Sequence, residues 1–177
     1  DLHDPRSLSD NQICAIYEDR DKGLWIGTRN GLNKYQRATD QFSRYLHDPS
    51  DPQSLSHNVV LSLCADPLGR LWIGTAGGGV NIFEPRSSQA GTAQFSHYQA
   101  NASAPNGLQS NFVAVTYADQ AGIIWIGTHG GGLYKFSQAK QAFRHYQGFP
   151  DEPGSLSHNA VRAIVEDRSG IFWIGTY

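Results

Sequence analysis

The tetrapeptide Trp-Ile-Gly-Thr occurs four times in the 177-residue chain, and these copies contain all of its tryptophans. Recurrence at about 40 to 50 residues is typical of arrays in which each repeat buries its apolar surface against its neighbours. We therefore expect residues 1–177 to fold as a single array rather than as separate domains. Successive copies begin 47, 53 and 48 residues apart, at Trp25, Trp72, Trp125 and Trp173.

The segment before each tryptophan has the pattern of a buried β-strand. In residues 13–17 and 113–117 the side chains at both alternating sets of positions are largely apolar. A strand has this pattern when both faces of its sheet are covered. The Trp-Ile-Gly-Thr segment itself combines aromatic and β-branched residues, which favours a second strand. Each first segment ends in an aspartate six residues before its tryptophan, at Asp19, Asp66, Asp119 and Asp167.

Glycine-bearing turns separate the predicted strands of each unit. Gly69, Gly122 and Gly170 lie in Asp-x-x-Gly sequences that predict a hairpin between the first two strands. A second glycine-bearing turn follows the first three Trp-Ile-Gly-Thr copies, and two more strand-like segments come after it in each of those units. Four strands per unit, the outermost being the most polar, predict the blade of a β-propeller.

The predicted fold class is all-β: a partial β-propeller with three complete four-stranded blades and the two inner strands of a fourth. The blade units span approximately residues 7–53, 54–106, 107–154 and 155–177, and the last is incomplete. Closed propellers usually have about 4 to 8 blades. We therefore expect a segment of a longer propeller, whose partners are further blades or another copy of the chain. Each tryptophan is expected to lie between neighbouring blades.

Composition excludes several classes of function. The formal net charge is −2, and the 14 Lys and Arg residues are scattered, so we expect no nucleic-acid partner. Apolar stretches are only a few residues long, so direct membrane insertion by this segment is not expected. Cys14 and Cys64 fall at different heights of successive inner strands, too far apart for a disulfide. Both are predicted to be free, buried thiols.

Several spaced elements together resemble the two-component regulator propeller repeat. The pattern is Ser-Leu-Ser-x-Asn, then Glu-Asp-x-x-Gly-x-Leu-Trp-Ile-Gly-Thr, then Gly-Leu-x-x-Tyr and Phe-x-x-Tyr. Residues 155–159 and 166–176 carry the first two elements, with Phe172 in place of the leucine, and the likeness covers essentially the whole chain. The resemblance implies a sensor region on the periplasmic or extracellular side of a bacterial inner-membrane receptor. It also implies an attached histidine kinase or diguanylate cyclase, neither of which lies within residues 1–177.

The candidate ligand-binding residues lie where two kinds of loop are expected to emerge on the same face. These loops are the turn after the second strand and the connector into the next blade, and polar side chains from several blades would converge there. The asparagine shared by all connectors is more simply explained by a side-chain to backbone hydrogen bond that shapes the turn. The residue before it varies, so a shared turn explains it less readily. The candidates are Asp10, Arg29, Asn30, His57, Ser110, His129 and His158.

The motifs of catalytic and cofactor sites are weak or missing from the sequence. The histidines lie on different blades without the short spacing of a metal site, so no metal is predicted. The glycine runs at 77–79 and 130–132 lack the following helix and Lys-Ser/Thr pair of a phosphate loop. Carboxylate pairs such as Glu18-Asp19 precede hairpins, where Asp normally binds the turn backbone. We therefore predict no catalytic residue and no cofactor.

These observations favour a non-catalytic module that senses a small-molecule or glycan-type signal and relays its binding to an attached enzyme. The first alternative is a propeller enzyme, a lyase or a glycan-active hydrolase. Close approach of His57, His129 or His158 to a carboxylate would favour that alternative. The second alternative is a structural platform for another protein, which a flat, apolar and cavity-free face would favour.

Overall fold

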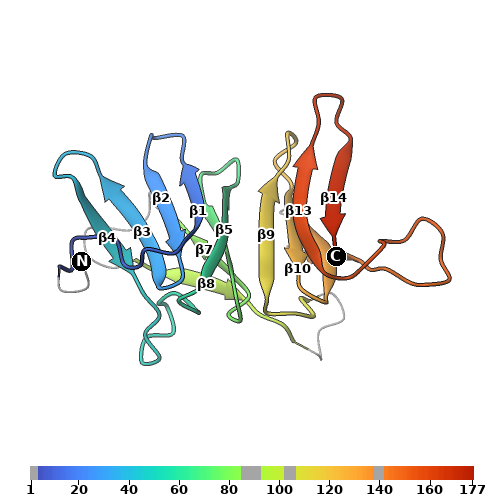
Figure 1. Ribbon diagram of the computed structural model, residues 1–177, viewed down its shortest axis with the longest axis horizontal. Coiled ribbons are helices and arrows are strands. Elements are labelled where there is room, and N and C mark those ends of the chain that lie inside the picture. The colour runs from blue at the N-terminus through green and yellow to red at the C-terminus, as the bar shows by residue number, and fades with distance from the viewer. Residues whose placement is uncertain (1–3, 85–92, 102–106, 138–141) are drawn as a thin grey trace.

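The computed structural model describes residues 4–84, 93–101, 107–137 and 142–177, and these ranges contain fourteen β-strands in four antiparallel sheets (Figure 1). Three sheets have four strands and one has two. The strands are β1 (Ile13–Glu18), β2 (Leu24–Thr28), β3 (Gly31–Gln36), β4 (Gln41–Tyr45), β5 (Val60–Ala65), β6 (Leu71–Thr75), β7 (Val80–Phe83), β8 (Phe95–Tyr98), β9 (Val113–Ala118), β10 (Ile124–Thr128), β11 (Gly132–Ser137), β12 (Ala142–Tyr146), β13 (Val161–Glu166) and β14 (Phe172–Thr176).

Each sheet is a meander in which consecutive strands pair, in the order β1-β2-β3-β4, β5-β6-β7-β8, β9-β10-β11-β12 and β13-β14. The first strands of successive sheets, β1, β5, β9 and β13, contact one another in chain order and lie at the centre of the array (Figure 1). The sheets are therefore blades arranged around an axis. The predicted fold, a partial β-propeller with three complete blades and the inner half of a fourth, is confirmed.

The hairpins between first and second strands form at the predicted glycines. Gly69, Gly122 and Gly170 have φ angles of +81°, +78° and +83°. An L-residue with a side chain rarely adopts this conformation, which explains why glycine recurs there. In the first unit Lys22 takes the left-handed position with a φ of +64°. The glycine of that unit, Gly23, lies one residue later.

The tryptophans of the first two blades lie between blades, as predicted. Trp25 and Trp72 are completely buried. The Trp25 ring lies 5.5 Å from Phe83 of the next blade, and the Trp72 ring lies 4.8 Å from Phe136 of the next blade. On its own blade Trp25 contacts Tyr45, at 5.9 Å between ring centroids. Each indole ring therefore joins two adjacent sheets into one apolar core.

The aspartate six residues before each tryptophan accepts a hydrogen bond from the indole nitrogen. The Nε1 to Oδ2 distances are 2.9 Å from Trp25 to Asp19 and 3.0 Å from Trp72 to Asp66. In the third and fourth units they are 2.8 Å and 3.1 Å. The other carboxylate oxygen accepts backbone N–H groups of the hairpin turn. One aspartate in each unit therefore satisfies both the indole donor and the turn.

Two residues that were expected to be buried are exposed. Trp173 is 61% exposed and Cys14 is also exposed, whereas Cys64 is buried as predicted. Both thiols are free. Strands β1 and β14 belong to the first and last sheets of the array, each of which has a described blade on only one side. The burial that the strand pattern predicts therefore occurs only where a neighbouring blade covers the second face of the sheet.

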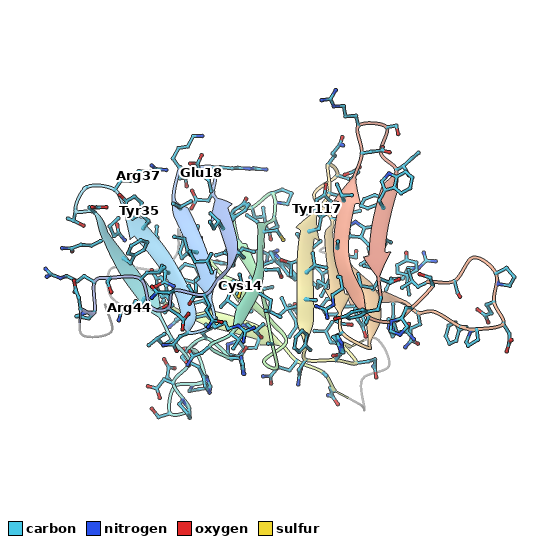
Figure 2. The ribbon with its side chains drawn as sticks, in the orientation of Figure 1. Cys14, Glu18, Tyr35, Arg37, Arg44 and Tyr117 are labelled. Carbon is cyan, nitrogen blue, oxygen red and sulfur yellow. The ribbon has the colours of Figure 1, made fainter. Side chains whose placement is uncertain are left out.

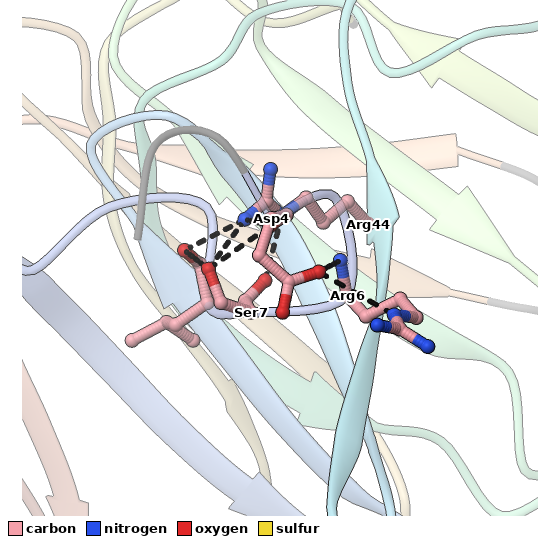
Figure 3. A network of polar contacts seen from close by, with 5 residues as sticks. Asp4, Arg6, Ser7 and Arg44 are labelled. Atoms are coloured by element: carbon pink, nitrogen blue, oxygen red, sulfur yellow. Dashed lines mark hydrogen bonds and ion pairs between the residues drawn. The ribbon is translucent and has the colours of Figure 1, made fainter.

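The segment before β1 is held against the outermost strand of its blade by Arg44 of β4 (Figure 3). The Arg44 guanidinium donates hydrogen bonds to the backbone carbonyls of Asp4, Ser7 and Leu8, and to the Ser7 hydroxyl. Arg6 forms an exposed ion pair with Asp4, 3.4 Å from Nε to Oδ1. The equivalent bond in the second blade runs from His97 to the Ser54 carbonyl, 2.8 Å apart. These contacts fix the paths by which the segments before β1 and β5 reach their inner strands.

Candidate functional site

The turn after the second strand and the connector into the next blade lie on the same face, as the sequence predicted. In successive units the backbone N–H groups of Gly31, Gly77 and Gly130 donate to asparagine carbonyls of the next unit's connector. The three distances are 2.6, 3.1 and 3.1 Å. Because these bonds join neighbouring blades, the face is a continuous rim built from both loop types. The acceptors are Asn58, Asn111 and Asn159.

The side chains of the same asparagines also bind backbone, but not within the turn as expected. Their Oδ1 atoms accept the N–H groups of His47, Ala100 and Gly148, at 2.7, 2.6 and 2.7 Å. Each bond spans eleven residues and closes the whole connector into a loop. The asparagines therefore position the rim, and the expectation of a bond confined to the turn is wrong.

The variable residue before each asparagine has one structural role in all four units. Its side chain accepts the N–H of the residue two positions later, at distances of 2.6 to 3.2 Å. A shared turn therefore explains this position in all four units, although the sequence suggested that it would do so less readily. Carboxylate oxygen, hydroxyl oxygen and imidazole Nδ1 can all accept this bond. The four acceptors are Asp10 Oδ1, His57 Nδ1, Ser110 Oγ and His158 Nδ1.

This capping role fixes the tautomer of two histidines. Because the Nδ1 atoms of His57 and His158 accept backbone N–H groups, the proton of the neutral ring is on Nε2. His57 is half-buried and His158 is exposed. Each Nε2–H is thus a donor on the rim that the turn itself does not use.

Part of the candidate set gathers between the third and fourth units. The His129 ring lies 5.4 Å from Phe112 and 6.0 Å from Tyr177, and Tyr177 lies 6.4 Å from His158. The Ser110 hydroxyl donates to the backbone carbonyl of His129 at 3.0 Å. All four ring residues are exposed. The result is an exposed group of rings with hydrogen-bonding nitrogens, a surface on which a flat or ring-shaped molecule can stack.

The structure does not bring the other candidates into this group. Asp10 binds Gln12 within its own turn, and the Arg29 N–H donates to the Gln12 carbonyl at 3.1 Å. The Asn30 N–H donates to the Thr28 hydroxyl at 3.1 Å. All these contacts stay within the first unit, and those of His57 stay within the second. The candidates therefore follow the rim of the array rather than forming one pocket.

Two members of the ring group, Phe112 and Tyr177, are missing from the predicted set. Tyr177 occupies the repeat position of Arg29 and His129, immediately after Trp-Ile-Gly-Thr, so the sequence contains the signal for it. Phe112 follows Asn111 at a position that Gln12 occupies in the first unit. Its side-chain type differs between units, and its exposure depends on the neighbouring turn.

The surroundings of the rim histidines bear on metal binding and on carboxylate-assisted chemistry. Within the described ranges, no group of three or more His, Cys, Asp and Glu side chains could hold a metal ion. The described partners of His57, His129 and His158 are backbone groups and aromatic rings rather than carboxylates. Among the residues described, no helix is long and apolar enough to cross a membrane.

Solved structures of similar fold include the extracellular domains of two proteins from B. thetaiotaomicron. The chain is 25% identical to the extracellular domain of BT3049, assigned as a hybrid two component system, with a TM-score of 0.77. It is 27% identical to the extracellular domain of BT4673, described as a one component system, with a TM-score of 0.73. The matches cover 97% and 98% of this chain but only 28% and 23% of those chains. The chain thus spans about a quarter of these relatives.

Virginiamycin B lyase from Staphylococcus aureus shares the fold at 10% identity, with a TM-score of 0.65 over 94% of this chain and 50% of the lyase. A search of curated proteins gave no significant sequence match. The family described as "Two component regulator propeller" matches four segments, residues 7–30, 54–77, 107–130 and 155–177, which together exceed half of the chain. With its repeats, its blades and these four matches, the chain belongs to the two component regulator propeller family.

Proposed function

We propose that the chain is the ligand-sensing propeller segment of a bacterial signal-transduction receptor, located on the periplasmic or extracellular side of the inner membrane. In this proposal the segment is non-catalytic, and an attached histidine kinase or diguanylate cyclase provides the output. Membership of the two component regulator propeller family and similarity to extracellular domains of such systems support the proposal. A rigid array can relay binding only if the ligand favours one of two arrangements of the receptor.

The observation that carries the sensing role is the exposed ring group at the rim. Phe112, His129, Tyr177 and His158 come from connectors and turns of adjacent units, so they are held by the blades rather than by one flexible loop. Aromatic faces and imidazole N–H groups suit a small-molecule or glycan-type signal, because sugar rings present both C–H faces and hydroxyls. Ser110 lies within this group, and Asp10, Arg29, Asn30 and His57 continue the polar rim along the first and second units.

Binding of soluble oligosaccharides tests this proposal directly. Isothermal titration calorimetry with a panel of neutral and acidic oligosaccharides should give saturable binding for at least one member. For that member, His129→Ala should weaken binding at least about tenfold, since it removes a ring and its donor from the group. Arg168→Ala is the matched control, because Arg168 is exposed in the β13–β14 hairpin at the other end of the blade. Equal loss in both variants would contradict a site at the rim.

Incubation of the chain with the same oligosaccharides, followed by analysis of the products, separates sensing from catalysis. If the chain converts an oligosaccharide into products, and His129→Ala abolishes that conversion, the enzyme alternative is correct. Unchanged oligosaccharide after prolonged incubation, combined with saturable binding, supports the non-catalytic proposal. The similarity to virginiamycin B lyase concerns the fold alone at 10% identity and does not favour an enzyme.

Further propeller blades, or another copy of the chain, are the proposed protein partners. A groove of about 570 Å³ lies beside Trp125 and is lined by Leu133, Tyr146 and Ile174. On the corresponding side of Trp72, Phe136 from the third strand of the next blade fills the core. The outer two strands of a complete four-stranded blade next to the third blade would thus fit the groove beside Trp125. Analytical ultracentrifugation of the 177-residue chain tests this idea, because a stable monomer in dilute solution would count against it.

A further inference from the structure

An open groove of about 610 Å³ lies between the second and third blades, at the opposite end of the inner strands from the rim. Its walls come mainly from β5 and β9 with their hairpins, and Tyr17 of β1 and Arg20 of the β1–β2 hairpin complete the lining. Pro67 in the β5–β6 hairpin lies against Gly122 in the β9–β10 hairpin. Figure 2 shows this end of the array, where Tyr117 and Glu18 are labelled, whereas Cys14 lies toward the rim. The groove therefore belongs neither to the ring group nor to the connectors.

The repeat shows what is missing from this groove. The inner-strand residue paired with the tryptophan is Tyr17 in the first blade and Tyr117 in the third, but Cys64 in the second. In the fourth unit it is Val165. The three complete blades are all described at this position, and among them only the second has a residue other than tyrosine.

Both tyrosines pack across the gap between blades. Tyr17 packs against the apolar cluster that contains Leu71 of the second blade. The Tyr117 ring lies 6.4 Å from Phe172 of the fourth unit, at nearly a right angle. Cys64 shares a cluster with Ile124 of the third blade, at the repeat position of Leu71 and Phe172, but its side chain ends at the sulfur. The second blade therefore has no phenol ring at this position, and Cys64 lines the groove there instead.

The inner surface of the groove suits an uncharged ring. Cys64 is buried, and burial raises the pKa of its thiol to about 12, so the sulfur stays protonated at neutral pH. Thr116, which also lines the groove, is buried and directs its hydroxyl to Ser62 at 3.2 Å. At the exposed edge Arg20 donates to the Pro67 carbonyl at 3.1 Å, and its cation faces solvent. The lining thus changes from neutral at depth to charged at the edge, where Arg20 and Asp119 both line the groove. The Asp119 carboxylate accepts the Ile123 N–H and the Trp125 indole N–H of its own blade, and Arg20 is the only cation in the described lining.

We propose that this groove binds a small phenol, whose ring takes the place that tyrosine rings occupy in the flanking blade interfaces, and that Arg20 favours phenols with an acidic substituent. Apolar cavities left by missing side chains bind molecules of matching shape, because the ring regains contacts that the lining lacks. The groove is larger than one ring and open on one side, which leaves room for the substituent to reach solvent. This inference is independent of the proposed sensing role, because it concerns the opposite end of the blades.

Titration with p-cresol, which is the tyrosine side chain as a free molecule, tests the proposal. Two-dimensional NMR of the ¹⁵N-labelled 177-residue chain should show saturable amide shifts in β5 and β9, with a Kd of about 0.1 to 10 mM, typical of a ligand of this size. The amides of Phe112 and His129 at the rim should not shift. No saturable shift in β5 and β9, or shifts spread over the whole chain, would overturn the proposal.

Two variants locate the ring. Cys64→Tyr restores the tyrosine of the flanking blades and should abolish p-cresol binding, whereas Cys64→Ser, which keeps the space, should retain it within about threefold. If p-cresol binds Cys64→Tyr as it binds the unmodified chain, the proposal is wrong. Because Cys64→Tyr adds bulk to the core, the shift map of the unmodified chain stands as the independent measurement if this variant does not fold.

The edge of the groove is tested with 4-hydroxyphenylacetate. This acid should bind more tightly than p-cresol by about threefold or more, and Arg20→Gln should bring the ratio of the two affinities to about one. Arg20 is exposed, so this variant is expected to fold normally. An equal affinity of the unmodified chain for both ligands would overturn the role of Arg20. Loss of oligosaccharide binding at the rim, measured separately, would concern only the sensing proposal.

Discussion

Replacing Trp72 with alanine tests the idea that indole rings hold the blades together. The Trp72 side chain has no exposed surface, and its ring lies 4.8 Å from Phe136 and 6.2 Å from Tyr98. A buried tryptophan removes about 150 to 250 Å² from water, which corresponds to roughly 4 to 6 kcal/mol at about 25 cal/mol per Å². Because alanine keeps part of that area and the unfolded chain already buries some, we expect a loss of about 3 to 5 kcal/mol.

The hydrogen bond of the indole contributes little to this expected loss. Asp66 accepts a hydrogen bond from the Trp72 indole at 3.0 Å. It also accepts hydrogen bonds from Arg70 Nε at 2.7 Å and from two backbone N–H groups. Its carboxylate therefore keeps hydrogen-bond partners in the variant, and no buried charge is left without one. The loss should come from packing between the second and third blades.

Trp173→Ala is the matched control, because the same repeat position is 61% exposed in the fourth unit. Its indole also donates to an aspartate, Asp167, at 3.1 Å. This control should cost no more than about 1 kcal/mol. Urea unfolding followed by circular dichroism gives both free energies by linear extrapolation. A cost below about 1 kcal/mol for Trp72→Ala, or equal costs for the two variants, would refute the interblade role.

Three further predictions concern thiol reactivity, a glycine turn and pH. A water-soluble thiol reagent should label Cys14 in the folded chain but Cys64 only after unfolding in urea, and equal rates would contradict the burial of Cys64. Gly79→Ala should lower the free energy of unfolding by roughly 1 to 3 kcal/mol, because Gly79 has a φ of +75° against the Tyr98 carbonyl. In thermal melts Gly130→Ala, which has open space at its Cβ position, should cost less. Hydrogen bonds from the Ser169 hydroxyl and the Trp173 indole lower the pKa of Asp167 to about 2. Its stabilisation is therefore full above about pH 4, the unfolded value, and is lost as the pH falls toward 2. Asp167→Asn should flatten the stability profile over that range, and an unchanged profile would contradict the shift.

The repeat made the architecture predictable from sequence. Each unit carries the same Trp-Ile-Gly-Thr segment with an aspartate six residues before it, so an ambiguous signal in one unit is resolved by its copies. The outermost strand, for example, has only a Phe and a Tyr to identify it in any one unit. Alignment of three such pairs predicts β4, β8 and β12, and the structure has all three.

Burial at the two ends of the array could not be predicted from the same pattern. Cys14 and Trp173 occupy repeat positions that look buried, yet both are exposed. A strand pattern records which faces are apolar, whereas burial depends on a second blade that the pattern does not contain. For the same reason the groove beside Cys64 becomes visible only when the flanking tyrosines are seen to cross the gap between blades.

One substitution between units shows how the fold keeps a contact while the residues change. In the first blade Asn33 Oδ1 accepts the Ser9 N–H at 3.0 Å, and in the second Asn81 Oδ1 accepts the Ser56 N–H at 2.8 Å. In the third blade the Tyr134 hydroxyl accepts the Gln109 N–H at 3.0 Å instead. In the aligned repeats Asn is replaced by Tyr, two residue types with little chemical similarity. The structure shows that both place an oxygen acceptor at the same connector.

The variable rim position follows the same rule and explains how the rim can vary without loss of the fold. The turn needs only one acceptor at this position, so Asp10, His57, Ser110 and His158 satisfy it equally. The remaining hydrogen-bonding groups differ: Asp10 has a second carboxylate oxygen and the two histidines have an imidazole Nε2–H, whereas Ser110 donates its hydroxyl proton to the His129 carbonyl. Because the turn does not use these remaining groups, they can differ between units and contact a ligand without loss of the turn. We therefore expect exchanges among Asp, Ser and His here to change ligand affinity far more than the free energy of unfolding.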